Sequence, residues 1–375
     1  MPCKDAAIST SWISTNFDLD QAVARWGDVI GLDTEFIRTD TFYPVAGLYQ
    51  IASGDEVYLL DPLAIDDWSR FVAYLENPDT VIIMHACQED LELLHHHLGA
   101  RPLGLFDSQF ANAYLSSDFS LSYARLVEQR LGFELSKHET RSNWLKRPLS
   151  DEQLRYAVED VIHLTPLYEK LSSELVELER TDWIAADIGS RTTYADIDPN
   201  DYYRNVKRAW QLDAQELPVL RELAAWRERT ARTLDIPRNR VVWDEHLLAF
   251  ARVANLTEQI VHDTLPRGIA RRFADHLLEY HAIGSSAEQL ELEPIERPLT
   301  SAQGALLKSL RDVARKKTEE LGLAPELMSR KRDLETCIRR YLECGDLSDF
   351  YSSWRAPHLA DNFRQMLSQL SQTGP

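Results

Sequence analysis

Short apolar runs alternate with amphipathic segments along roughly the first 185 residues. The runs have the length and composition of strands, and the segments between them have the apolar spacing of helices. The predicted strands lie at residues 8–13, 29–36, 48–52, 57–60, 81–85 and 105–106. The predicted helices lie at residues 18–26 (with Asp18 as N-cap), 67–76, 89–98, 108–115, 120–131 and 151–178. This order predicts a mixed α/β sheet flanked by helices, with its first strands antiparallel.

Strand signals end at a polar, turn-rich stretch, and helices dominate the rest of the chain. We therefore predict an α/β domain at residues 1–188, a linker at 189–210, and two all-α domains at 211–290 and 295–375. Apolar positions of the two helical stretches match at an offset of 87 residues: Leu220, Leu223, Trp226, Leu234, Ile236 and Leu247 align with Leu307, Leu310, Val313, Leu321, Leu323 and Leu334. Such a match also arises by chance between helices, but a loop proline recurs one residue out of step, which favours duplication.

The composition argues against a membrane protein and against a secreted protein. No run approaches the roughly 18 apolar residues of a membrane span, so we expect no membrane association. The first residues lack a signal-peptide pattern, and the four scattered cysteines form no CxxC pair, so we expect a cytoplasmic protein. The net charge of −19 argues against nucleic acid on its face. Residues 301–375, however, carry 12 Lys and Arg against 10 Asp and Glu, a weak hint of a polyanionic partner there.

The predicted strand at 29–36 carries two carboxylates. Asp33 and Glu35 are two positions apart, so both side chains point to the same face of the strand. Two desolvated carboxylates repel each other, and bound cations or a shared proton would relieve that repulsion. For this pair alone, a strand end in solvent with both acids hydrated is the favoured explanation. Other acids along the chain decide between these interpretations.

Two further clusters follow. Asp90 lies where the strand at 81–85 runs into a helix, and Tyr156 and Asp160 stack one turn apart on a helix. Alone, the latter pair is typical of a core tyrosine beside a surface acid. Four acids on three elements, however, match the oxygen ligands that Mg²⁺ or Mn²⁺ requires. Two such ions clamp the attacking water and the leaving oxygen of a phosphodiester.

Three motifs carry a resemblance to a known family. Residues 30–36 (Ile-Gly-Leu-Asp-Thr-Glu-Phe), 85–91 (His-Ala-x-x-Glu-Asp-Leu) and 156–161 (Tyr-Ala-x-x-Asp-Val) resemble the three exonuclease motifs of the DEDD superfamily. They are most similar to those of the ribonuclease D family, and the similarity extends through Phe42-Tyr43-Pro44 and residues 144–149. The resemblance implies a ribonuclease-H-like fold that removes nucleotides one at a time from an RNA 3′ end, giving 5′-monophosphates.

The resemblance also implies a role for each site residue. Asp33, Glu35 and Asp160 would hold one divalent ion. Asp33 would share the second ion, which Asp90 would support through water. Tyr156 would position the attacking water, and Arg155, where a second branch of the superfamily has histidine, favours the tyrosine branch. The residues expected to contact the terminal nucleotide are Thr34, Phe36 and His85, the last with a purely structural role as the alternative.

The helical stretches resemble HRDC domains, which in this family occur as a tandem pair. The first stretch fits well through Trp226-Arg227 and Pro237-Arg238-Asn239, whereas the second lacks the tryptophan. We expect RNA with a free 3′ end as the partner, transfer RNA precursors and other small stable RNAs above all. A DNA exonuclease is the rival within the enzyme class, and a catalytically silent RNA-binding scaffold is the rival outside it. The presence of all four acids disfavours the scaffold.

Two weaker signals have simple explanations. His95, His96 and His97 look like a metal cluster, but consecutive helix residues point in different directions, so a solvated helix face is favoured. Basic clusters at 267–272 and 308–317 have the charge to follow a phosphate backbone, and solvated helix faces explain them equally well.

Overall fold

The computed structural model describes residues 9–135, 142–189, 194–286 and 292–372. The chain divides into two compact units: residues 1–37, 46–194 and 299–375 form the first, and residues 38–45 and 195–298 form the second. Among the described residues, no helix combines the length and the apolar character that crossing a bilayer requires.

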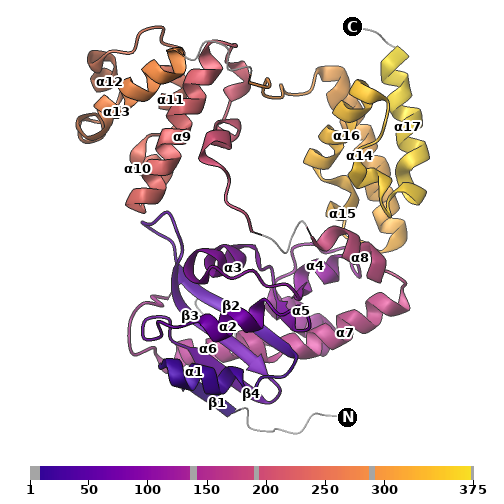
Figure 1. Cartoon of the computed structure of the whole chain (residues 1–375). Coiled ribbons are helices and arrows are strands. Elements are labelled where there is room, and N and C mark those ends of the chain that lie inside the picture. The colour runs from indigo at the N-terminus through magenta and orange to yellow at the C-terminus, as the bar shows by residue number, and fades with distance from the viewer. Residues whose placement is uncertain (1–8, 136–141, 190–193, 287–291, 373–375) are drawn as a thin grey trace. The chain divides into compact units, whose positions relative to one another are not determined.

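A six-stranded sheet organises the first unit (Figure 1). Its strands, in sheet order, are β1 (Ser9–Ile13), β4 (Glu56–Leu60), β3 (Val45–Ser53), β2 (Val29–Ile37), β5 (Val81–Met84) and β6 (Leu105–Asp107). Strand β5 runs parallel to β2 and β6, whereas β3 is antiparallel to β4, so the predicted mixed sheet is confirmed. The first strand of the chain departs from the prediction, because β1 runs parallel to β4.

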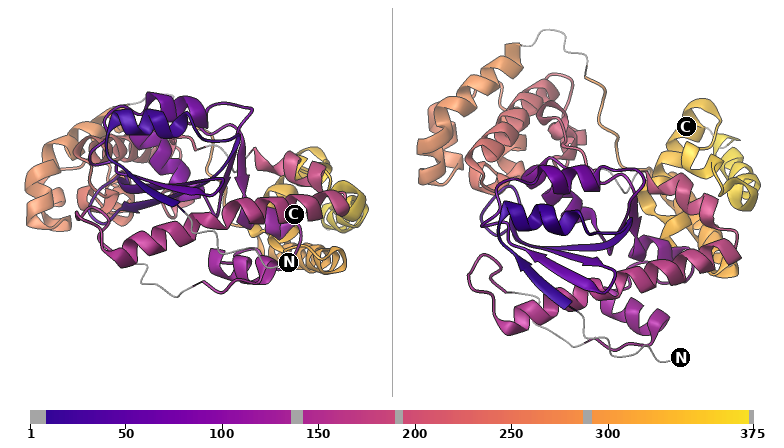
Figure 2. Two further views of the ribbon diagram at one scale, coloured as in Figure 1. Left: turned by 90° about the horizontal axis from the view of Figure 1, so that it is seen from below. Right: turned by 60° about the horizontal axis from the view of Figure 1, so that its bottom comes forward.

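Helices cover both faces of this sheet (Figure 2). One face packs against α1 (Asn16–Val23), α2 (Ser69–Leu75) and α3 (Gln88–Leu93), and α3 continues as a π-helical turn, η1 (Leu94–Leu98). The other face packs against α6 (Asp151–Ile162) and the start of α7 (Leu164–Glu177). The remaining helices of this domain are α4 (Ser108–Ala113), α5 (Tyr123–Leu131) and α8 (Thr181–Ile188). A separate apolar cluster therefore lies between each face of the sheet and the helices that cover it.

Two helix predictions were wrong in detail. Helix α1 is capped by Thr15, whose hydroxyl oxygen accepts a hydrogen bond from the Asp18 backbone amide at 3.1 Å, so Asp18 lies inside the helix. The single helix predicted at 151–178 is two helices that meet at His163. Pro166 gives the reason, because a proline has no amide to bond the fourth preceding carbonyl and its ring collides with that carbonyl. The break ends α6 two residues after Asp160.

Two helical bundles follow. The first bundle consists of α9 (Glu216–Leu234), α10 (Arg238–Val241), α11 (Asp244–Ala251), α12 (Glu258–Thr264) and α13 (Arg267–Ser286), preceded by the 3₁₀ turns η2 (Pro199–Asn205) and η3 (Ala209–Gln211). The second bundle consists of α14 (Ser301–Leu321), α15 (Glu326–Ser329), α16 (Lys331–Cys344), η4 (Asp349–Ser352) and α17 (Ala356–Gln372). Both bundles begin with a long helix, continue with a very short one and end with a long one. This shared order is what an internal duplication produces.

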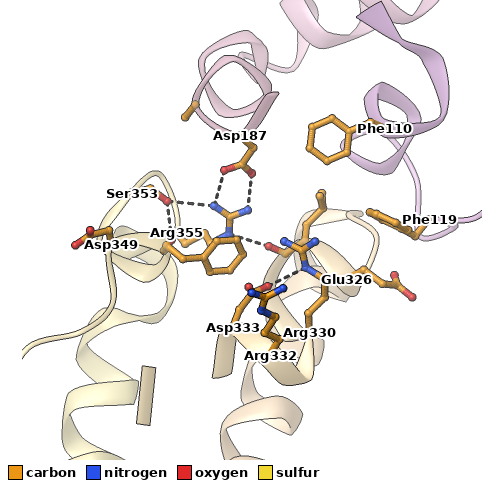
Figure 3. Close-up of a pocket in the computed structure, with 13 residues that line it drawn as sticks. Phe110, Phe119, Asp187, Glu326, Arg330, Arg332, Asp333, Asp349, Ser353 and Arg355 are labelled. Atoms are coloured by element: carbon orange, nitrogen blue, oxygen red, sulfur yellow. Dashed lines mark hydrogen bonds and ion pairs between the residues drawn. The ribbon is translucent and has the colours of Figure 1, made fainter. Parts of the chain in front are cut away.

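The second bundle belongs to the same compact unit as the sheet. Arg355, only 1% exposed, donates two hydrogen bonds to the carboxylate of Asp187 in α8, at 3.0 and 2.5 Å (Figure 3). Next to this ion pair, the rings of Trp183 and Trp354 stack with centroids 4.5 Å apart. A buried bidentate ion pair that is flanked by stacked aromatic rings makes a specific junction between α8 and the second bundle.

The loop between β2 and β3, residues 38–44, belongs to the second unit together with Val45, the first residue of β3. Phe42 is buried in the core of the first bundle, and its ring lies under the guanidinium of Arg238 at 4.5 Å. The carboxylate of Asp235, at the end of α9, accepts hydrogen bonds from the backbone amides of Phe42 (2.9 Å) and Tyr43 (3.0 Å). The Phe42-Tyr43-Pro44 motif of the sequence therefore anchors this loop on the first bundle.

Candidate active site

Strand β2 presents Asp33 and Glu35 on the same face, as the alternation of side chains predicts. Ile30 and Leu32 point into the apolar cluster beneath α1, α2 and α3, so the intervening positions face α6 and α7. Gly31 allows a close approach there, because a Cβ at this position would lie 2.9 Å from the Leu164 Cβ and 3.1 Å from the Val161 carbonyl oxygen. The glycine thus lets the α6–α7 junction contact the strand that carries the two carboxylates.

Helix α6 brings Asp160 to the same place. Carboxylate oxygens of Asp33, Glu35 and Asp160 lie within 4.8 Å of one another, so the three groups could hold one metal ion. Beside them is a small pocket of about 150 Å³, lined by Asp33, His85, Tyr123, Tyr156, Asp160 and Leu164. No cationic side chain is among these six lining residues, so the pocket offers the carboxylates no counter-charge.

The electrostatics of the carboxylates follow from burial and mutual repulsion. Burial, and then the charges of Asp160, Asp90 and Glu35, raise the pKa of Asp33 well above its usual value. Burial, and then the charges of Asp160 and Asp90, raise the pKa of Glu35 to about 8, and burial raises the pKa of Asp160 to about 7. A cluster of hard oxygen donors this crowded suits a small divalent cation such as Mg²⁺ or Mn²⁺, which would offset the repulsion.

Asp90 lies outside this triplet. It belongs to the first turn of α3, is 9% exposed, and its carboxylate accepts a short hydrogen bond from the Thr34 hydroxyl. Burial raises the pKa of Asp90 to about 6. Thr34 points to the opposite face of β2 from Asp33 and Glu35, so Asp90 is tied to the strand that carries both of them.

The tyrosine predicted to act on water lies one turn before Asp160. The Tyr156 hydroxyl forms a hydrogen bond with the Asp160 carboxylate, and this bond lowers the pKa of Asp160 against the effect of burial. The ring of Trp144 lies 6.1 Å from the Tyr156 ring. Trp144 is itself packed against β3, where a Cβ on Gly47 would lie only 2.6 Å from the Trp144 Cβ. The predicted motif at 144–149 therefore supports the side of the site that holds Tyr156.

The three residues expected to contact substrate lie near the acids. Thr34 is buried and bonded to Asp90, and Phe36 is half-buried against the apolar cluster beneath α3. Both nitrogens of the His85 ring already have partners, at 3.0 Å from the Ser108 hydroxyl and 3.1 Å from the Leu121 carbonyl oxygen. That pattern is the structural alternative foreseen for His85, although its ring also lines the pocket.

Two further residues contribute to the site: sequence reasoning missed Tyr123, and it noted Asp107 only as an acid at a strand end. Tyr123, at the start of α5, lines the pocket, and its ring packs at 5.6 Å from the ring of His85. Asp107 caps α4 and also accepts a hydrogen bond at 3.1 Å from the amide of Ala86, which has a left-handed φ of +56°. Asp107 thereby fixes the turn that leads into α3 and Asp90. A strand-end acid followed by Ser108 is a recognisable capping signal, whereas Tyr123 has no local signal.

The three consecutive histidines lie in the turn η1 and do not form an evenly solvated face. His95 and His96 are half-buried against Tyr194, and the His97 ring nitrogen Nδ1 lies 2.7 Å from the Tyr49 hydroxyl. The rings of His95 and His96 therefore lie side by side, with centroids 4.9 Å apart, and only that of His97 is directed to a different partner.

Comparison with known proteins decides the family. Residues 10–176 match the 3′–5′ exonuclease domain family, and residues 216–279 match the HRDC domain family. The chain is 41% identical to ribonuclease D of Pseudomonas paraeruginosa over 354 residues, which cover 92% of this chain and 94% of that protein. The chain belongs to the ribonuclease D family. It is therefore a 3′–5′ exoribonuclease, a metal-dependent hydrolase.

A second ribonuclease D agrees with this assignment. Ribonuclease D of Escherichia coli is 31% identical over 356 residues, covering 92% of this chain and 94% of that protein. Its crystal structure, described as that of an exoribonuclease involved in structured RNA processing, matches with a TM-score of 0.86 over 96% of this chain and 99% of that one. The catalytic core of RRP6 from Trypanosoma brucei, 21% identical, matches with a TM-score of 0.57 over 75% of this chain and 81% of that one, a likeness in fold alone.

Proposed function

We propose that this ribonuclease D homologue trims RNA 3′ ends by hydrolysis at Asp33, Glu35 and Asp160, with two divalent cations. The observation that carries the proposal is the convergence of three carboxylates to within 4.8 Å without a cationic partner among the pocket residues. Bound cations would activate the attacking water and stabilise the charge that develops on the leaving oxygen.

The acids of the site would bind the two cations, and Tyr156 would orient the attacking water. Asp33, Glu35 and Asp160 would hold the first cation, and Asp33 would also face the second. Asp90 would support the second cation through water, and the Thr34 hydroxyl would keep the Asp90 carboxylate oriented. The Tyr156 hydroxyl, already aimed at Asp160, would accept the attacking water as its new hydrogen-bond partner. Each cycle would release one nucleoside 5′-monophosphate.

The branch assignment rests on Tyr156. A hydroxyl that forms a hydrogen bond to a candidate metal ligand is well placed to orient water at the same ion. Arg155, the neighbouring residue, is exposed, so its side chain is not directed at the acids. We therefore assign the chain to the tyrosine branch of the superfamily.

Substrate contacts would come from one face of β2 and from His85, the residue after β5. Thr34 and Phe36 would lie against the terminal nucleotide. The ring face of His85, whose two nitrogens are occupied, would contact a base or sugar by packing. These contacts would place the last nucleotide beside the pocket that Asp33 and Asp160 line.

We further propose that the second bundle is an HRDC-like domain and that the α/β domain is ribonuclease-H-like. The second bundle repeats the helix order of the first, and Leu247 and Leu334, one offset of 87 residues apart, are both fully buried. The preferred RNAs would be transfer RNA precursors and other small stable RNAs, whose structured bodies the bundles would hold. The predicted cytoplasmic location stays a prediction.

The test is digestion of a 5′-labelled transfer RNA precursor with several trailing nucleotides, in the presence of Mg²⁺ or Mn²⁺ and then EDTA. We expect a ladder that shortens by single nucleotides, release of 5′-monophosphates, and no reaction after chelation. A single-stranded DNA of the same trailing sequence, added as competitor substrate, tests the DNA exonuclease. Faster shortening of the DNA than of the RNA would overturn the substrate assignment.

A further inference from the structure

The first bundle contains a pocket of about 540 Å³ that lies in the second compact unit and includes none of the active-site residues. Its lining is Tyr202, Lys207, Arg208, Arg227, Arg238, Asn239, Trp243, Asp244, Glu245 and Leu248, and we call it the Trp243 pocket. Its volume falls in the range of roughly 300–1,000 Å³ that is usual for small-molecule sites. Four basic, two acidic and three polar or aromatic residues line it together with one leucine, so basic side chains outnumber acidic ones in a chain whose net charge is −19.

One aromatic side chain of the pocket is unusually exposed. Trp243, between α10 and α11, is 52% exposed, although most of the large apolar side chains of this bundle are in its core. Leaving an indole in water has an unfavourable free energy unless it serves a contact. A second ring, that of Tyr202, is half-buried in the same lining. Exposed aromatic rings beside arginine and lysine are the usual platform for stacking nucleobases.

Arg227 supplies the observation that points to a ligand. It is 1% exposed, and its Nη1 donates to the Val242 carbonyl oxygen at 2.9 Å and pairs with Asp244 at 2.8 Å. Its Nε and Nη2, although shielded from solvent, have no hydrogen-bond partner among the described residues. The Tyr202 ring lies over this guanidinium at 5.6 Å. Buried charged donors without acceptors destabilise a fold, and an anionic ligand that shifted the Tyr202 ring would supply acceptors.

Two exposed cations complete the pocket. Lys207 and Arg208 lie between η2 and η3, and neither side chain has a hydrogen-bond or ion-pair partner in the described part of the chain. Arg208 adopts a φ of +67°, a left-handed conformation that is costly for a residue with a Cβ. The fold therefore holds an unpaired guanidinium, on a residue with a left-handed backbone, in the pocket that Trp243 also lines, where it could bind a phosphate.

A second cavity, in the first unit, is a weaker candidate. It lies at the junction of α8 with the second bundle and is also rich in arginine (Figure 3). There Arg355 is already paired with Asp187, and Arg330 is paired with Asp333 at 2.8 Å. Arginines that are neutralised by carboxylates have little attraction left for phosphate. In the Trp243 pocket Arg227 is paired with Asp244 and Arg238 with Glu228. Nε and Nη2 of Arg227 and the side chains of Lys207 and Arg208, however, have no acceptor among the described residues, so the Trp243 pocket is favoured.

We propose that the Trp243 pocket is a nucleotide subsite for the RNA substrate, distant in sequence from the acids, in which a base stacks on Trp243 and its phosphate meets Lys207, Arg208 and Arg227. The proposal rests on RNA being the substrate. The subsite would read no sequence, because stacking and phosphate contact are common to all nucleotides. It would hold an internal nucleotide of the RNA, and a free nucleoside monophosphate has the same chemistry.

The test measures binding of a fluorescein-labelled oligoadenylate to the full chain carrying Asp33→Asn, with Mg²⁺, as a function of salt. Trp243→Ala should weaken binding about tenfold without changing the salt dependence, and Trp243→Phe should restore most of the loss. The double variant Lys207→Ala/Arg208→Ala should weaken binding and lower the slope of log affinity against log salt by about 2. The matched control is Arg267→Ala/Arg271→Ala, which removes two exposed cations of α13 in the same bundle.

Three outcomes overturn the proposal. The first is unchanged affinity in both pocket variants, and the second is an equal loss in the α13 control, which would show a diffuse electrostatic effect. The third is competition by adenosine 5′-monophosphate that displaces the oligoadenylate fully at stoichiometric concentration, which would assign the pocket to the free nucleotide. Hydrolysis of RNA by the otherwise unaltered protein is measured in parallel. Retained hydrolysis with any of these outcomes refutes the subsite alone, and absent hydrolysis refutes the proposed function.

Discussion

The Thr34 hydroxyl donates a hydrogen bond to the Asp90 carboxylate and so joins strand β2 to helix α3. Thr34 lies between Asp33 and Glu35 but faces the other side of the strand. One face of the strand therefore presents the carboxylates of Asp33 and Glu35, and the opposite face binds a third carboxylate, that of Asp90, through the Thr34 hydroxyl. A displacement of β2 would move all three acids together.

Removing this hydroxyl should disturb the metal site without removing any proposed ligand. Thr34→Val keeps the shape of the side chain and leaves the buried Asp90 without its donor, so we expect activity or metal affinity to fall by roughly 10–100-fold. Thr34→Ser keeps the hydroxyl and should retain most activity. The measurement is the Mg²⁺ concentration at half-maximal rate. A raised KM for RNA with an unchanged metal midpoint would show instead that Thr34 acts only on the substrate.

Tyr156→Phe should reduce kcat by roughly 100-fold or more and leave KM nearly unchanged, because a water-orienting hydroxyl acts in the transition state. Tyr168→Phe is a matched control: Tyr168 is a half-buried tyrosine of α7 outside the pocket lining. Single-turnover rates of RNA shortening are the measurement. Equal rates for the Tyr156→Phe variant and the unaltered protein would remove Tyr156 from the reaction.

Metal-free protein should lose stability as the pH rises. The folded chain holds the proton of Glu35 up to a pKa of about 8, whereas the unfolded chain releases it near the ordinary 4.5. Between these values the unfolded state binds fewer protons, so the free energy of unfolding decreases with rising pH. We expect the Tm in EDTA to fall more steeply from about pH 5 to about pH 8 for the unaltered protein than for Glu35→Gln. Identical pH profiles would contradict the raised pKa.

The stabilisation of the protein by added Mg²⁺ should increase with rising pH, whereas the stability of the metal-free protein should decrease. Cation binding must displace protons from the acid cluster, so the rise in Tm caused by Mg²⁺ should be larger near pH 8 than near pH 5, since each proton released tightens binding by roughly tenfold per pH unit. A Mg²⁺-induced shift that is independent of pH would mean that the carboxylates are already ionised without metal.

Gly31→Ala tests the contact between β2 and the α6–α7 junction. The new Cβ would lie 2.9 Å from the Leu164 Cβ and 3.1 Å from a backbone oxygen, so the strand and helix must separate. We expect a loss of about 1–3 kcal/mol in the free energy of unfolding, measured in urea, and lower activity. Gly27→Ala is the control, because nothing lies within 4 Å of a Cβ there, and it should stay within about 0.5 kcal/mol.

Local sequence patterns predicted the parts of the site that depend on one element at a time. The alternation of β2 placed Asp33 and Glu35 on one face, and the i,i+4 spacing of α6 paired Tyr156 with Asp160. The contact between Thr34 and Asp90, 56 residues apart, and the position of Tyr123 depend on how separate elements pack. No local pattern encodes such contacts. Pro166 did signal the end of α6, but the amphipathic pattern that continues past it outweighed that signal.

In the fold, too, the sequence predicts features that depend on one element and does not predict those that depend on contacts between distant elements. Six strands and the flanking helices follow from apolar runs and helical spacing, because each reflects burial of its own side chains. The parallel pairing of β1 with β4 and the grouping of the second bundle with the sheet are decided by contacts such as that of Asp187 with Arg355, 168 residues apart. Nothing in the local sequence around Asp187 or Arg355 indicates that the two side chains form an ion pair, because the pair exists only once α8 and the second bundle have packed together.

The most direct test of the central claim, that Asp33 belongs to a metal-dependent hydrolytic site, is the Asp33→Asn variant with a 5′-labelled precursor RNA and Mg²⁺. This neutral isostere removes one member of a mutually repelling cluster, so the metal-free protein should be at least as stable as before. We predict that it binds the RNA with unchanged affinity, loses the Mg²⁺-induced rise in Tm, and shortens the RNA no faster than the reaction without enzyme. RNA shortening by Asp33→Asn at the rate of the unaltered protein would contradict the account.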